Sequence, residues 1–125
     1  MLAARALRNN FHTARRLYGL SVVYRRGPLF VELAVAVGRT ETENVDTEGV
    51  VSVRGRVRDY LIAASELILN GQHVRPEAGD TIEQWVGSVK MIHEVRPIAD
   101  GQHWRWHDPN EETFRVHTKW IRSEP

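Results

Sequence analysis

Residues 20–37 read LSVVYRRGPLFVELAVAV, and this stretch decides the fold. Two runs rich in apolar and β-branched residues, 20–26 and 29–37, flank a Gly-Pro pair that favours a sharp turn. In the second run Phe30 and Glu32 alternate with apolar neighbours, which is the two-residue period of a strand buried on one face. The stretch therefore predicts two strands joined by a hairpin or a sharp corner.

The chain that follows this hairpin has the same β-type pattern. Short alternating segments bounded by turn residues predict strands at 49–53, 56–62, 81–86, 88–95, 104–106 and 113–121. Residues 63–69 predict a short helical turn leading into Asn70-Gly71, a dipeptide that favours a type I′ turn. About seven short strands with regularly spaced turns predict a small antiparallel β-barrel or sandwich.

The N-terminal segment has a helical pattern instead. Its apolar residues recur at spacings of three and four, at Ala3, Leu7, Phe11, Ala14 and Tyr18. This pattern predicts an amphipathic helix over residues 2–18 that ends at Gly19. We expect a mainly β (α+β) single domain over 1–125, with the helix in 1–19 and the barrel in 20–121.

The formal net charge of +1 conceals an uneven distribution of charge. Residues 1–31 carry six arginines and no acid, while the remaining 94 residues hold 11 basic and 16 acidic side chains. A basic segment thus precedes an acidic body, which bears on association rather than on fold. Arg-rich, acid-free amphipathic segments also occur in mitochondrial transit peptides, so that interpretation stays open for the N-terminus.

Several classes of function are disfavoured by what the sequence lacks. The chain has no cysteine, which excludes disulfides, thiolate metal clusters and thiol nucleophiles. Its longest apolar run, 29–37, is far shorter than the about 20 residues of a membrane-spanning helix. Its nine glycines are scattered at turns, and no serine lies in a G-x-S-x-G motif. We therefore expect no enzyme activity, no cofactor and no membrane partner.

Histidines are the one well-represented type of catalytic residue. His103, His107 and Asp108 lie close in sequence, and His93 and His117 are predicted on strands that can be neighbours. In an extended segment, however, the Cα atoms of residues 103 and 107 are about 13 Å apart, too far for both side chains to bind one ion. The pattern favours polar turn histidines over a metal site.

The spacing of the acidic residues likewise gives no support for a catalytic pair of carboxylates. Asp59, Asp80 and Glu83 are the candidates for such a pair, but nothing in the sequence sets two of them at a working distance. Asp80 follows Gly79 and is more simply interpreted as a turn residue.

The sequence Trp104-Arg105-Trp106 has two interpretations. Exposed aromatic and basic side chains on a small barrel can stack nucleic-acid bases, which would make the protein a nucleic-acid-binding module. In a strand, however, the two indoles share one face and Arg105 lies on the other, and large aromatic side chains are usually buried. We favour core-facing indoles.

Four stretches resemble a set of small tailed-phage and prophage proteins found among head-completion and head-to-tail connector components. They are Tyr24-Arg25-Arg26-Gly27, Arg58-Asp59-Tyr60-Leu61-Ile62, the segment 76–82 (PEAGDTI), and Trp104 to Pro109 (WRWHDP) closing on 114–119 (FRVHTK). The resemblance covers about residues 22–119, and its motifs are structural rather than catalytic.

This resemblance implies a stopper or head-closure protein. Such a protein is a small β-barrel with an appended helix that assembles as a ring beneath the portal and adaptor. It seals the DNA-filled head and provides the platform for tail attachment, without enzyme activity. The implied location is the virion, after synthesis in the host cytoplasm. A small β-barrel module that binds nucleic acid or protein is the alternative.

The resemblance also implies roles for two charged segments. Stopper-type proteins carry a long barrel loop that faces the channel, and the candidate here is 39–48, with Glu41, Glu43, Asp46 and Glu48 as an acidic ring that repels DNA phosphates. An ordinary solvated loop is the alternative. The basic helix, through Arg5, Arg8, Arg15 and Arg16, is expected to dock on an acidic neighbouring subunit or on the adaptor.

Overall fold

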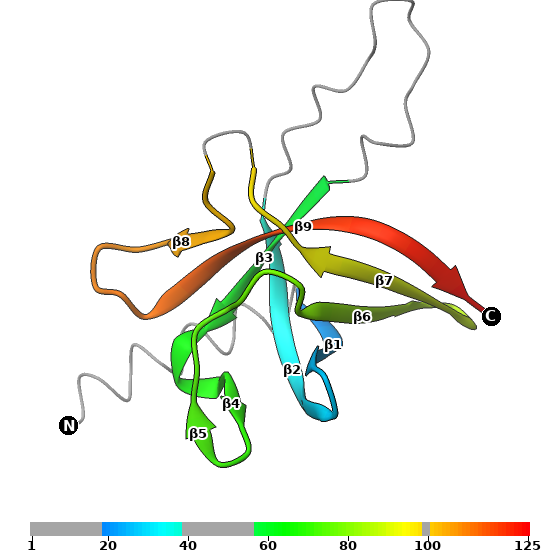
Figure 1. Ribbon diagram of the computed structural model, residues 1–125, viewed down its shortest axis with the longest axis horizontal. Helices are drawn as coiled ribbons and strands as arrows, with labels where there is room; N and C mark the ends of the chain where they lie inside the picture. The colour runs from blue at the N-terminus through cyan, green and yellow to red at the C-terminus, as the bar shows by residue number, and fades with distance from the viewer. Residues whose placement is uncertain (1–18, 39–56, 99–100) are drawn as a thin grey trace, which may run out of the picture.

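The computed structural model describes residues 19–38, 57–98 and 101–125. These residues form nine strands and one 3-10 turn (Figure 1). In chain order they are β1 (Leu20–Arg26), β2 (Leu29–Gly38), β3 (Val57–Ala63), η2 (Ala64–Glu66), β4 (Ile68–Leu69), β5 (Gln72–His73), β6 (Thr81–Val86), β7 (Val89–Val95), β8 (Trp104–Trp106) and β9 (Thr113–Glu124).

Six antiparallel strands close into a barrel. Their order is β3-β2-β1-β6-β7-β9, and pairing of β3 with β9 completes the ring. The long strand β9 makes this closure possible, because residues 113–119 pair with β3 while residues 118–124 pair with β7. Strand β8 adds to β9 beside the barrel. Closure gives each barrel strand two neighbours and so leaves no open edge in the barrel itself.

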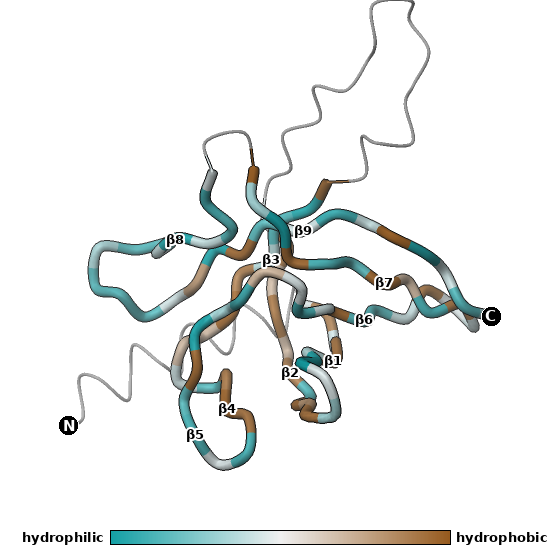
Figure 2. Tube along the Cα trace, in the orientation of Figure 1, coloured by the Kyte–Doolittle hydropathy of each residue, from teal (hydrophilic) through white to brown (hydrophobic). Residues whose placement is uncertain are grey.

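The barrel interior is filled by alternate residues of each strand. In β1, Val22 and Tyr24 are buried while Ser21 is exposed, and in β2 Leu33 and Val35 alternate with exposed residues. Figure 2 shows mainly apolar colouring along β2, whose one charged residue is Glu32. The core comprises Val22, Tyr24, Leu33, Val35, Tyr60, Ile62, Leu67, Leu69, Ile82, Val95, Phe114 and Val116.

Most of the predicted β-elements are confirmed. Strand β1 has the predicted bounds. The helical turn predicted over 63–69 is limited to η2 at 64–66, and residues 68–69 form β4 instead. Asn70 and Gly71 have φ of 54° and 76°, the two positive values that a type I′ turn requires. The short pair β4–β5 on either side of this turn was not predicted. Strand β9 runs to Glu124 rather than 121, because pairing with Lys90 and Met91 of β7 extends it.

The predicted helix over 2–18 and the predicted strand 49–53 both lie outside the described residues. Within the described ranges there is no α-helix, so the architecture there is β throughout apart from η2. No helix of this part of the chain is long and apolar enough to cross a membrane.

Candidate functional site

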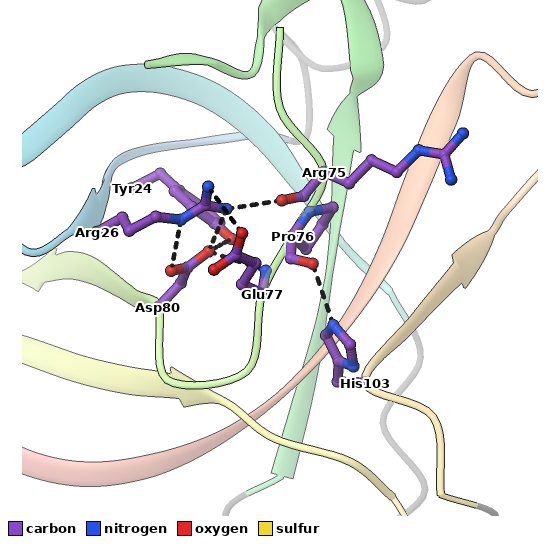
Figure 3. Close-up of polar contacts among 7 residues, drawn as sticks. All are labelled: Tyr24, Arg26, Arg75, Pro76, Glu77, Asp80 and His103. Atoms are coloured by element: carbon purple, nitrogen blue, oxygen red, sulfur yellow. Dashed lines mark hydrogen bonds and ion pairs between the residues drawn. The ribbon is translucent and has the colours of Figure 1, made fainter. Parts of the chain in front are cut away.

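Asp80 is the centre of a buried polar cluster that joins β1 to the segment before β6 (Figure 3). Asp80 is only 3% exposed. Its carboxylate accepts a hydrogen bond from the Tyr24 hydroxyl and two from Arg26, through Nε and Nη2, each 2.9 Å. The backbone N–H of Glu77 donates another at 2.9 Å. Four donors thus replace the water that this carboxylate loses on burial.

Arg26 extends the Asp80 cluster along the chain. Its Nη2 donates to the carbonyl of Arg75 at 2.6 Å, and its Nη1 lies 3.3 Å from the Glu77 carboxylate. Tyr24 is fully buried, and burial followed by the hydrogen bond to Asp80 raises the pKa of Tyr24 well above its usual range. The hydroxyl therefore stays protonated and donates at every physiological pH. The cluster ties the β1–β2 hairpin to the segment that enters β6.

A second buried cluster lies on β3 and β9. The Asp59 carboxylate pairs with Arg115 Nε at 2.8 Å and with His117 Nδ1 at 2.9 Å. Burial alone would raise the pKa of Asp59, but the His117 hydrogen bond and the charges of His117 and Arg115 lower it overall. A Cβ on Gly38 of β2 would approach the Arg115 guanidinium to 3.2 Å, so this glycine permits the close packing of that side chain.

These two clusters are built from the stretches that carry the resemblance. Tyr24 to Arg26 meets the segment 76–80, and strand residues 58–62 pair with 118–114 of β9. The residues that carry the resemblance therefore hold segments that are distant in the sequence against one another. His117 Nε2 is buried without a hydrogen-bond partner among the described residues. None of these contacts brings a nucleophile to the Asp59–His117 pair.

A third cluster of polar side chains lies in the barrel interior. Gln84 Oε1 accepts hydrogen bonds from the Tyr60 hydroxyl, at 2.9 Å, and from Arg58. The same Tyr60 hydroxyl lies 3.3 Å from His93 Nδ1. His93 is 4% exposed, and burial, assisted by the nearby charge of Arg58, lowers the pKa of His93 to about 4. His93 is therefore neutral at pH 7.

This buried histidine predicts a pH-dependent stability. An unfolded histidine has a pKa of about 6.5, so between about pH 6.5 and pH 4 the unfolded chain binds a proton that the folded chain does not. The free energy of unfolding should fall by about 3 kcal/mol as the pH falls through this window. We expect His93→Gln to flatten this slope in denaturant titrations at several pH values, whereas His73→Gln, at an exposed position, should not. Equal slopes for the two variants, or titration of the His93 ring near 6.5 in NMR of the unmodified chain, would contradict this.

The histidines considered as metal ligands lie in separate surroundings. His103 Nε2 contacts the carbonyl of Pro76 at 3.0 Å, and His107 Nδ1 lies 3.5 Å from Arg115. His93 points into the barrel, and His117 pairs with Asp59. Among the residues that the structure describes, no group of three or more His, Asp or Glu side chains converges on a possible metal ion.

The tryptophans of β8 pack as the strand interpretation predicts. Trp106 stacks on Phe114 with ring centroids 4.9 Å apart, and Trp104 meets the same ring edge-on at 5.0 Å. Both indoles are half-buried against the core, while Arg105 is exposed. The core-facing interpretation is confirmed, and these indoles are not free platforms for bases.

The charged residues predicted to act in assembly lie outside the described residues. This holds for the loop acids Glu41, Glu43, Asp46 and Glu48 and for Arg5, Arg8, Arg15 and Arg16. Sequence reasoning missed the Asp80 cluster, although Asp80 does sit in the predicted turn, with its N–H donating to Glu77. The available signal was that Tyr24 to Arg26 and the segment 76–82 are both among the stretches that resemble head-to-tail connector proteins.

Comparison with known families agrees with this structural character. The model of the family described as phage head-tail joining protein matches residues 1–125. The chain belongs to this family. No curated protein and no solved structure matches it.

Membership of the head-tail joining family confirms the resemblance to head-to-tail connector proteins. The chain is a structural component of the bacteriophage virion, and its role implies contacts with other head and tail proteins. The buried polar clusters accordingly hold the strands and turns of this connector subunit together.

Proposed function

We propose that this head-tail joining protein is a stopper or head-closure subunit. Copies of the chain assemble into a ring below the portal and adaptor, seal the DNA-filled head and present the platform for the tail. The observation that carries the proposal is the match of the whole chain to the head-tail joining family. The closed barrel supports it, because a subunit without open barrel edges keeps its shape while the ring is assembled.

The geometry of β2 and β3 supports a channel loop. Gly38, the last residue of β2, pairs with Asp59 of β3, so the chain that connects them leaves and returns at one end of the barrel. Those eighteen residues, 39–56, include Glu41, Glu43, Asp46 and Glu48. Repeated around a ring, these carboxylates repel the phosphates of passing DNA, so the DNA slides through without sequence-specific binding.

The basic N-terminal segment supplies the contact between subunits in this proposal. Arg5, Arg8, Arg15 and Arg16 meet an acidic surface on the neighbouring copy or on the adaptor. Repetition of one head-to-tail contact about an axis closes a ring. The alternative, a nucleic-acid-binding barrel, has less support, because Trp104 and Trp106 are occupied by packing on Phe114.

Electron microscopy of the purified chain, alone and with particles that lack it, tests the proposal. We expect rings with a central bore, and density for residues 39–56 directed at that bore. Particles lacking the protein should retain the portal, lose their DNA and carry no tail until the chain is added. A strictly monomeric protein that these particles do not take up would refute the ring, and a bore lined by other residues would refute the channel loop.

A further inference from the structure

A groove of about 450 Å³ lies between η2 and the turn that joins β8 to β9. Its apolar lining comes from β3 and the start of η2, through Leu61, Ala63 and Ala64. The opposite wall is the segment 107–113. The small side chains of Ala63 and Ala64 leave the groove open to a partner that presents apolar residues.

The turn that forms this wall is acidic. Residues 107–112 include three acids, Asp108, Glu111 and Glu112, and no lysine or arginine. Asp108 holds the turn, because its carboxylate accepts hydrogen bonds from the backbone N–H groups of Glu112 and Thr113. Glu111 and Glu112 are exposed, and neither forms an ion pair in the described part of the chain. Their charges are therefore available to a basic partner.

The chain itself carries a segment of matching chemistry. Residues 1–18 contain four arginines, no acid, and apolar residues at helical spacing that include Leu7 and Phe11. Such a segment can place its apolar side chains on the lining of the groove and its arginines beside the acidic wall.

The strand registers place the residue that follows this segment, Gly19, near the groove. Leu20 pairs with Val35, which puts Gly19 level with Ala36, and Ala36 pairs with Leu61 in the groove. The segment thus joins the barrel two strands, or about 10 Å, from Leu61. As a helix, residues 2–18 would span about 25 Å, enough to extend beyond their own barrel.

We infer that the groove receives the N-terminal segment, residues 2–18, of a neighbouring copy of the chain. The inference rests on the proposed ring, in which every subunit gives a basic segment to one neighbour and accepts one from the other. It assigns the acceptor surface to Leu61, Ala63 and Ala64 as apolar lining and to Glu111 and Glu112 as the charged wall.

The absence of cysteine allows a clean crosslinking test. One set of chains carries Ala3→Cys or Ala14→Cys, and a differently tagged set carries Ser65→Cys at the exposed end of the groove. After mixing and mild oxidation, we expect disulfide adducts between the two sets. Ser88→Cys, at another exposed serine in the β6–β7 turn, is the matched control and should give none. Glu111→Lys with Glu112→Lys should lower the adduct yield about tenfold, whereas Glu94→Lys on β7 should leave it unchanged.

The outcomes separate this inference from the proposed ring. Rings without Ser65 adducts would overturn the docking and leave the ring intact. Adducts in open chains or dimers without rings would support the docking and overturn the ring. Adducts only within a chain that carries both cysteines, with none between mixed chains, would show that the segment covers its own barrel and would overturn the inference.

Discussion

Replacing Asp80 with alanine is expected to lower the free energy of unfolding by about 3–5 kcal/mol. The change leaves the fully buried Tyr24 hydroxyl without its acceptor and removes both hydrogen bonds that the carboxylate receives from Arg26. Domains of this kind have total stabilities of about 5–15 kcal/mol, so the loss is a large fraction of the whole. Urea unfolding followed by tryptophan fluorescence measures it directly.

Glu77→Ala is the matched control for this prediction. Glu77 pairs with the same Arg26, but its side chain is 67% exposed, so its loss should change the free energy of unfolding by less than about 1 kcal/mol. If Asp80→Ala were no more destabilising than Glu77→Ala, the Asp80 cluster would have no special role in holding the hairpin to β6.

Changing Arg8, Arg15 and Arg16 together to glutamate should leave the monomer folded and block its incorporation into the connector. The triple variant reverses the charge of the segment, and like charges facing each other across an interface cost several kcal/mol. A cost of about 1.4 kcal/mol corresponds to a tenfold loss of binding affinity. We therefore expect weaker docking of the subunit to lower the yield of infectious particles about 100-fold or more. Circular dichroism checks the fold, and complementation of a phage that lacks the gene measures the yield.

The same three positions changed to lysine provide the control. Lysine keeps the positive charge, so assembly should be largely retained if charge complementarity drives docking. Particles of the glutamate variant that contain the protein at its normal stoichiometry would show that the basic segment has no part in assembly.

Most of the barrel was predictable because its signals are local. The Gly-Pro turn after Arg26, the Asn70-Gly71 turn and two-residue alternation each act within a few residues, and each predicted the right element. The end of β9 was not predictable in this way. Its last three residues, Arg122, Ser123 and Glu124, are all polar or charged, and they form a strand because β7 lies beside them.

The polar clusters were beyond sequence reasoning for a related reason. Tyr24 and Asp80 are 56 residues apart, and Asp59 and His117 are 58 apart. Nothing within either local segment shows that its partner will be adjacent. The resemblance marked these stretches as shared with connector proteins, but it did not reveal that they contact one another.

The sequence alone determined that the chain is mainly β, that its charge is divided between a basic segment and an acidic body, and that it resembles a phage connector protein. Those properties follow from composition, short-range periodicity and motifs, which are all written along the chain. Only the tertiary structure decided that the sheet closes through β3 and β9, that Asp80 and Asp59 are buried with their partners, and that Leu61 lies in a groove beside an acidic turn. These features depend on which distant strands pair, and pairing is set by the burial of all the strands together in one core.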